Sequence, residues 1–163
     1  MKKLILGLLL ATVTVLTCAF IAGCASDLSG DLYEFEVVKA AYGNGLSAQE
    51  KEILENHYQG LNEVNAGYAY LFDSEKSYTY GKLKTEDEKK DGDKSLFASG
   101  STTGYYKISG GKLYLLKTEK DVEKTGEDLE KAASGILEVS QGKLVKVEKD
   151  EKTGTVVKTV YKK

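Results

Sequence analysis

Most of the chain after residue 65 consists of short segments in which apolar and polar residues alternate, and tight-turn sequences separate these segments. A period of two residues is typical of strands that bury one face. Residues 68–72 and 78–80 alternate in this way around a turn at residues 73–76, which predicts a β-hairpin. Repeated hairpins of this kind restrict the chain to an antiparallel sheet.

Two further hairpins share a common pattern. The segment Gly104–Leu113 recurs later in the chain as Gly135–Leu144, with glycine, serine, glycine, lysine and leucine at matching places. Such a match indicates either an internal repeat or two unrelated hairpins with similar turn chemistry. Both segments contain a two-residue turn sequence, Gly110-Gly111 in the first and Gln141-Gly142 in the second.

The turns fix the register of each hairpin. A turn at Gly110-Gly111 places Ile108 opposite Leu113 and Tyr106 opposite Leu115, so one face is apolar. The same register in the second hairpin is less regular, because it predicts that a leucine, Leu137, faces a lysine, Lys146. A last hairpin runs from residues 144–147 through a turn at 150–154 to residues 156–161.

The N-terminal part of the domain is predicted to form a strand and then a helix. Residues 32–37 alternate, with Tyr33, Phe35 and Val37 on one side. Ser47-Ala48-Gln49-Glu50 has the spacing of a capping box, and apolar residues at helical spacing follow it, which predicts a helix from about Ala48 to Asn62.

Two charged segments are less regular. Residues 84–95 have no apolar face and indicate a solvated loop, after which Leu96 and Phe97 begin a short strand. Residues 121–133 are predicted to be either a loop or a short helix. The chain as a whole is therefore predicted to be mainly β, an antiparallel meander of eight to nine strands with one N-terminal amphipathic helix. Its edges require either closure into a barrel or cover by the helix.

The N-terminus has the features of an export signal. Lys2-Lys3 precede a stretch without charge from Leu4 to Gly23, which ends in Ile21-Ala22-Gly23-Cys24. These four residues resemble the lipobox of bacterial lipoproteins, which implies cleavage between Gly23 and Cys24 and acylation of Cys24 by diacylglyceryl and palmitate groups. The alternative is an uncleaved transmembrane helix, because about 20 apolar residues suffice to span a bilayer.

The lipobox resemblance divides the chain into three parts. Residues 1–23 are the signal peptide, predicted to be helical, residues 24–30 are a small, polar tether, and residues 31–163 are the β domain. It implies a membrane-bound protein held through Cys24 and facing outside the cytoplasm, on the cell membrane or the outer membrane.

The β domain is similar in pattern to the lipocalin-like domains of small bacterial lipoproteins. The similarity rests on Gly30-Asp31-Leu32-Tyr33-Glu34-Phe35 in the first strand, the capped helix at Leu46-Ser47-Ala48-Gln49-Glu50, and the last strand ending in Val160-Tyr161-Lys162-Lys163. The chain has Leu32 where the lipocalin signature has tryptophan, so the similarity implies an architecture and no particular ligand.

Composition excludes several classes of function. Acidic residues outnumber basic ones by 25 to 23, and the chain contains no arginine, which argues against nucleic acid as a partner. The one histidine, His57, lies on the predicted helix and has no nucleophile or second ligand at a meaningful spacing, so we expect no catalytic residues, no metal site, no cofactor and no enzymatic activity.

The tyrosines are the remaining candidates for a site. All 11 come after residue 32, and several fall on predicted neighbouring strands, where they serve either as packing residues or as a binding surface. The predicted ligand-binding residues are Tyr68, Tyr70, Tyr78, Tyr80 and Tyr106. Two functions stay open. The first is binding of a small apolar or amphipathic ligand in a cavity. The second is that of a surface interaction protein without a cavity, such as an inhibitor, an adhesion protein or an envelope-structure component, which would contact its partner protein through an exposed patch.

Overall fold

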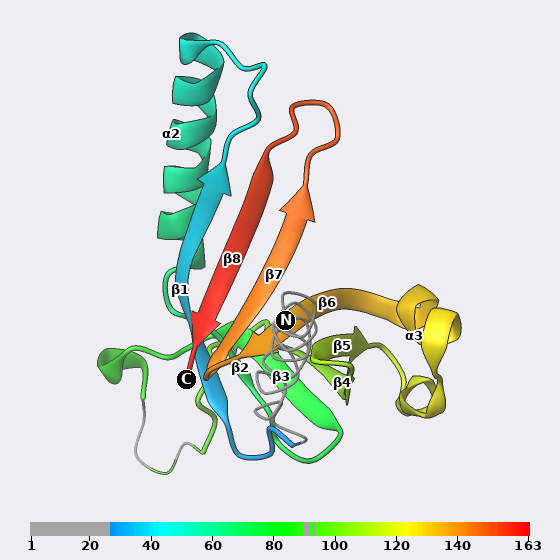
Figure 1. The fold of residues 1–163 in the computed structure, drawn as a ribbon. Coiled ribbons are helices and arrows are strands. Elements are labelled where there is room, and N and C mark those ends of the chain that lie inside the picture. Colours follow the sequence, from blue (N-terminus) through cyan, green and yellow to red (C-terminus); the bar gives the residue numbers. More distant parts are fainter. Residues whose placement is uncertain (1–26, 90–91, 93) are drawn as a thin grey trace, which may run out of the picture.

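A computed structural model describes residues 27–89, 92 and 94–163, and these form a closed antiparallel barrel. Each strand pairs with the next one in sequence, and the last strand pairs with the first, as Figure 1 shows. The strands are β1 (Leu32–Ala41), β2 (Tyr68–Leu71), β3 (Ser77–Lys82), β4 (Thr102–Ser109), β5 (Lys112–Leu116), β6 (Ala133–Ser140), β7 (Lys143–Lys149) and β8 (Val156–Lys162). The predicted mainly-β meander with an early helix is confirmed. The predicted signal peptide and Cys24 lie outside the described residues.

The hairpin turns set the strand register as their sequences predict. Ile108 pairs with Leu113 and Tyr106 with Leu115. Gly110 and Gly111 both have positive φ, 58° and 76°, the backbone conformation that a type I′ turn requires. The hairpin of β2 and β3 is confirmed as well, with Tyr70 paired to Tyr80.

The hairpin of β6 and β7 differs from the prediction. Its turn places Ser140 opposite Lys143, but the pairing ends at Glu138 and Val145, so the predicted pair of Leu137 with Lys146 does not form. Leu137 is fully buried in the barrel, where a lysine ammonium would lose its water without gaining a partner. The two strands separate at this point. Beyond it, toward the top of Figure 1, β7 is paired with β8 alone, and this pairing extends to Lys149 and Val156.

A β-bulge interrupts the alternation of β1. Phe35 pairs with Tyr161 and Val37 with Val160, so one extra residue, Glu36, lies between them. The predicted inward position of Val37 is therefore wrong, because the bulge shifts the pattern by one residue. Val38 is the buried residue instead, and the Glu36 carboxylate forms an ion pair with the Lys143 ammonium at 2.8 Å.

A hydrophobic core fills the lower half of the barrel, as oriented in Figure 1. Its core consists of tyrosine, phenylalanine and leucine side chains from all eight strands and from the segment before β1. The fully buried members with the largest side chains include Tyr106, Phe72, Leu28, Leu113, Leu137 and Leu144.

The segment before β1 belongs to this core. Leu28 has no exposed surface, and the Gly30 amide donates to the Phe72 carbonyl at 2.8 Å. The Tyr106 hydroxyl donates to the Ser74 carbonyl at 3.0 Å and lies 3.4 Å from the Asp27 carboxylate. Residues 27–30, predicted to be part of a tether, are instead held against the barrel. Burial of the Leu28 side chain is favourable by an amount that a solvent-exposed linker would not gain.

Helix α2 (Ala48–Asn65) lies beside the upper part of β1 (Figure 1). The predicted capping box is present: the Glu50 amide donates to the Ser47 hydroxyl and the Ser47 amide donates to the Glu50 carboxylate. The helix is three residues longer than predicted and has no fully buried residue. It packs against a three-stranded extension of the barrel formed by β1, β8 and β7.

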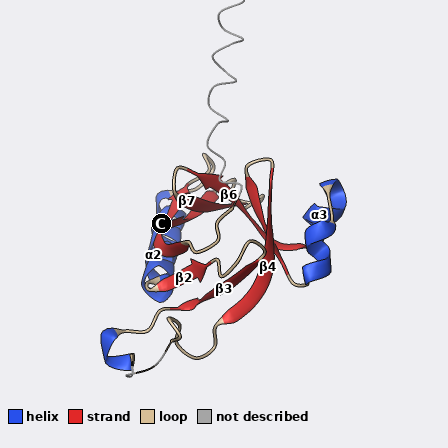
Figure 2. Ribbon diagram, turned by 90° about the horizontal axis from the view of Figure 1, so that it is seen from below, coloured by secondary structure: helices blue, strands red, loops and turns tan. Residues whose placement is uncertain are grey.

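The segment between β5 and β6 is helical, which decides between the two alternatives for residues 121–133. A 3-10 helix, η2 (Glu119–Glu123), leads into helix α3 (Gly126–Ala132), and Val122 and Leu129 pack on Tyr114 and Leu116 outside the barrel. Figure 2 shows α3 and α2 on opposite sides of the barrel. The described part of residues 84–95 is mostly exposed and contains the short 3-10 helix η1 (Glu86–Glu88). Phe97 forms only an isolated bridge with Leu83 in place of the predicted short strand.

Candidate functional site

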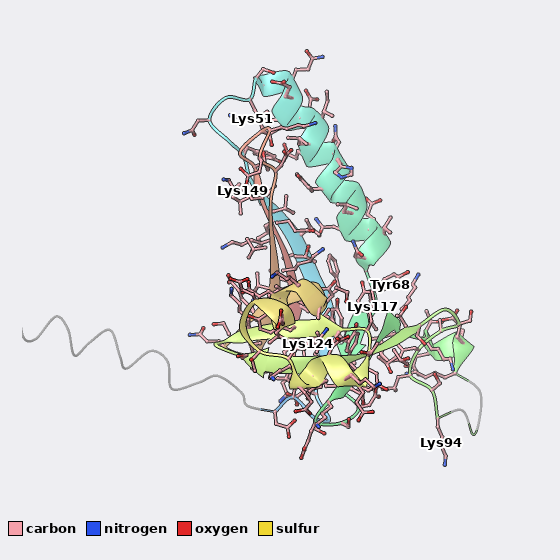
Figure 3. The ribbon with its side chains drawn as sticks, turned by 90° about the vertical axis from the view of Figure 1, so that its right-hand side faces the viewer. Lys51, Tyr68, Lys94, Lys117, Lys124 and Lys149 are labelled. Atoms are coloured by element: carbon pink, nitrogen blue, oxygen red, sulfur yellow. The ribbon has the colours of Figure 1, made fainter. Side chains whose placement is uncertain are left out.

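The upper barrel contains an open cavity of about 590 Å³ between α2 and the strands. Its walls come from the inner faces of β1, β7 and β8, from α2, and from the part of β6 that has separated from β7. The point at which β6 and β7 separate therefore lies beside the cavity. Figure 3 places Lys149, which lines its rim, near the end of β7 that reaches farthest up along α2.

Three tyrosines form the floor of the cavity. Tyr70 lies against Tyr80 with ring centroids 4.4 Å apart and against Tyr161 at 4.9 Å, and Tyr80 and Tyr161 are 6.4 Å apart. The three rings come from β2, β3 and β8, so closure of the barrel brings them together. They separate the cavity from the solid core below.

The hydroxyls of Tyr70 and Tyr161 are held in the protonated form. Burial raises the pKa of Tyr70, with a smaller contribution from Tyr80 and Tyr78. Burial also raises the pKa of Tyr161, and the neighbouring Tyr70 adds to the effect. A protonated phenol both donates and accepts hydrogen bonds. The floor thus consists mainly of aromatic ring surface, and its polar groups are the tyrosine hydroxyls.

Apolar and polar side chains both line the cavity above the floor. Leu115, Leu137, Val38, Val157 and Leu61 contribute the apolar surface. The polar and charged lining residues are His57, Tyr58, Asn65, Ser134, Lys146, Glu148, Lys149, Asp150 and Thr159. Along β7, the charged residues Lys146 and Glu148 lie farther from the floor than the buried Leu144.

Asn62 holds helix α2 against β1. Its side-chain oxygen accepts from the Val38 amide at 2.6 Å, and its amide nitrogen donates to the Val38 carbonyl at 3.2 Å. The pairing of β2 with β1 ends at Glu34, so this part of β1 has no strand neighbour on that side. Asn62 supplies hydrogen bonds that a neighbouring strand would otherwise make. These bonds hold α2 in place as the wall of the cavity opposite the strands.

The five predicted ligand-binding tyrosines have different places. Tyr70 and Tyr80 line the cavity. Tyr78 and Tyr106 are buried in the core, 7% and 2% exposed, and do not line it. Tyr68 is half-buried near the lower end of α2 (Figure 3), with its ring 5.6 Å from that of Tyr80, and it is not among the residues that line the cavity.

Sequence reasoning missed three lining residues that matter for the site. Tyr161 completes the floor, but it lies at the far end of the chain, and only closure of the barrel places it beside Tyr70. Lys146 and Glu148 lie on the same face of β7 as the buried Leu144, because every second residue of a strand points to the same side. The irregular Leu137–Lys146 pair was the available signal for this opening.

The described residues contain no group of three or more histidine, cysteine, aspartate or glutamate side chains placed to hold a metal ion. His57 is exposed on α2 at the rim, with its ring 5.4 Å from that of Tyr58. In the part of the chain that the structure describes, no helix is both long enough and apolar enough to cross a membrane. Comparison with protein families, curated proteins and solved structures finds no significant match to this chain.

Proposed function

We propose that the protein is a lipid-anchored, non-catalytic binding protein of the cell envelope, and that it holds a small amphipathic molecule in the cavity of its upper barrel. The cavity beneath α2 carries this proposal. Small-molecule sites are typically clefts of about 300–1,000 Å³ with mostly apolar walls and a few polar groups. The volume and the aromatic floor agree with that description, although polar groups make up more of the lining than is typical.

The distribution of polarity favours an amphipathic ligand over a wholly apolar one. The apolar part of the ligand would lie on Tyr70, Tyr80 and Tyr161 and displace water from their rings, which is favourable in proportion to the area covered. Its polar part would remain at the rim among Lys146 and Glu148. A purely apolar ligand would leave those charged groups without a partner or push them away from water.

The second candidate, a surface interaction protein without a cavity, has less support. It requires a continuous exposed apolar patch. The large apolar side chains that the described residues expose most are Ile53 and Val64 on α2, Leu96 in a loop and Val147 on β7. Single apolar residues spread over separate elements are normal for a protein surface.

The anchor is proposed from the sequence at Cys24. Each buried methylene of an acyl chain contributes about 0.8 kcal/mol, so the two or three chains of a bacterial lipoprotein would hold the domain permanently on a bilayer. The location would be the outer face of the cell membrane or the outer membrane. Replacement of Cys24 by alanine should abolish incorporation of labelled palmitate, and label retained by the Cys24→Ala protein would refute acylation at this residue.

Ligand binding is tested by filling the cavity. Leu61 lines it from α2, whereas Ile53 on the same helix is 61% exposed. Native mass spectrometry of the protein purified from its own membrane should show a co-purifying small molecule. Leu61→Trp should lose this molecule because the indole occupies its space, and Ile53→Trp should keep it. The proposal fails if no molecule accompanies the unmodified protein, or if Leu61→Trp retains it fully.

A further inference from the structure

The charged residues of the cavity follow a fixed order along β7. Leu144 is fully buried at the level of the tyrosine floor, and Lys146 and Glu148 are the next two residues on the same face. Residues on one face of a strand are about 7 Å apart. From the inside outward, β7 therefore carries a leucine, then a lysine, then a glutamate on this face.

Strand β8 places one residue opposite each of these three residues of β7, and each such pair is called a level of the cavity. Tyr161 lies opposite Leu144, Thr159 opposite Lys146, and Val157 opposite Glu148. The Lys146 level thus has a lysine ammonium and a threonine hydroxyl, both of which donate hydrogen bonds to an anion. It is the first charged level above the floor.

The Glu148 level is acidic and aromatic. Tyr58 reaches it from α2: burial raises the pKa of this tyrosine, and the nearby Tyr42, Asp150 and Glu148 raise it further. Asp150 accepts the Lys152 amide at 2.9 Å and the Thr153 hydroxyl at 3.0 Å. Two carboxylates and a phenol ring therefore line the outer part of the cavity together with Lys149, and the carboxylates and the ring attract a cation.

The charged residues of β7 that line the cavity form two exposed ion pairs. Lys149 pairs with Glu151 at 3.2 Å in the turn after β7. The Lys146 and Glu148 side chains form an ion pair at 2.7 Å, with 43% and 57% of their surfaces exposed. Ion pairs this exposed are weak, so the charged groups of a ligand can replace each partner at little cost.

From this order we infer the class of ligand: a zwitterionic, single-chain amphiphile whose anionic group follows directly on its apolar chain and whose ammonium group lies farther out. The inference rests on the proposed binding function. The chain would cover the tyrosine floor, the anionic group would accept from Lys146 and Thr159, and the ammonium group would lie between Glu148 and the ring of Tyr58. The volume of about 590 Å³ favours one chain over two.

Two zwitterions with the same chain and opposite charge order test this directly. In dodecylphosphocholine the phosphate lies next to the chain and the ammonium outside, whereas dodecyl sulfobetaine has the ammonium next to the chain and the sulfonate outside. Binding of each to the purified full-length protein is measured calorimetrically below the critical micelle concentration. We expect dodecylphosphocholine to bind at least about tenfold more tightly, a difference of roughly 1.4 kcal/mol.

The matched variant exchanges the two charges. The double substitution Lys146→Glu with Glu148→Lys keeps the net charge and both exposed positions, and it should reverse the preference between the two probes. Equal affinity of the unmodified protein for both, a preference for the sulfobetaine, or a preference that the exchange leaves unchanged would overturn the inference while leaving the cavity as a binding site. Failure of both probes, together with dodecyltrimethylammonium, laurate and monolaurin, would contradict the proposed function itself.

Discussion

Leu28 shows how a single side chain defines where the folded domain begins. It precedes the first strand in sequence, but it is fully buried among Tyr33, Phe72 and Tyr106 in the lower core. Local sequence gives little sign of this, since the neighbours Asp27, Ser29 and Gly30 are small or polar.

Replacement of Leu28 by alanine should therefore destabilise the protein strongly. Replacement of a buried leucine by alanine costs about 2–5 kcal/mol. The side chain's transfer free energy is lost, and so are the packing contacts of the residues around the void that the substitution leaves. Leu96→Ala is the matched control: Leu96 is 45% exposed, and its loss should change the free energy of unfolding by less than about 0.5 kcal/mol. Urea unfolding measures both values, and similar values for the two variants would contradict the packing of Leu28.

The buried tyrosines predict alkaline sensitivity. Burial raises the pKa of Tyr106 to about 12, although the Leu28 backbone opposes this in part. An unfolded tyrosine has a pKa of about 10. The folded state therefore binds the proton more tightly, and its contribution to stability is complete below pH of about 10 and is lost as the pH rises to about 12.

The free energy of unfolding should therefore fall as the pH rises over this range. In the Tyr106→Phe variant it should fall less steeply, because this variant lacks one of the tyrosine hydroxyls whose ionisation is coupled to unfolding. Tyr70 and Tyr161, whose pKa values are also raised, keep part of the slope in the variant. Urea midpoints between pH 9 and 12, with tyrosinate absorbance as a second signal, measure the effect. If the free energy of unfolding of Tyr106→Phe depends on pH as steeply as that of the unmodified protein, the Tyr106 hydroxyl has the same pKa in the folded and unfolded states.

Among the elements, α2 is joined to β1 by two hydrogen bonds from a single side chain. It has no fully buried residue, and Asn62 makes two hydrogen bonds to the backbone of Val38. Asn62→Ala leaves the Val38 amide and carbonyl without these partners, at a cost of about 1–3 kcal/mol. The amides of α2 and of Val38 should then exchange faster with deuterium. Asn56→Ala, at an exposed position of the same helix, should leave exchange unchanged, and equal effects of the two substitutions would argue against this attachment.

Elements with distinctive local chemistry could be predicted from the sequence. The capping box of α2 and the glycine turn between β4 and β5 both involve residues close together in the chain, and both are confirmed. The bulge at Glu36 could not be predicted, because Tyr33, Phe35 and Val37 alternate without interruption. Its cause is the pairing with β8 at the other end of the chain.

The candidate site was predictable only in part for the same reason. Tyr70 and Tyr80 face each other across one hairpin, so their proximity follows from local register. Tyr161 joins them only after the barrel closes. The separation of β6 from β7, which opens the cavity, had one sequence sign: a lysine predicted opposite a buried leucine.

At the scale of the whole molecule, the barrel has a closed end and an open end. Leu28 and its neighbours fill the end at which the domain begins, and the cavity lies at the other end, beside α2. Successive residues of an extended strand rise about 3.3 Å, so the ten residues of β1 span roughly 30 Å between these ends. Only Ala25 and Ser26 separate Cys24 from the packed residue Asp27, a reach of roughly 10 Å.

An anchor at Cys24 would consequently hold the closed end against the lipid and point the cavity away from it. Single cysteines labelled with a fluorophore test this orientation on vesicles that contain nitroxide-headgroup lipids, since the acylated Cys24 does not react. A label at Glu75, in the turn next to Asp27, should be strongly quenched, and one at Glu151, in the turn between β7 and β8, should not. A long Gly-Ser insertion after Ser26 should reduce the difference, because the domain could then tumble. Equal quenching at both positions without the insertion would mean that the barrel does not stand on its closed end.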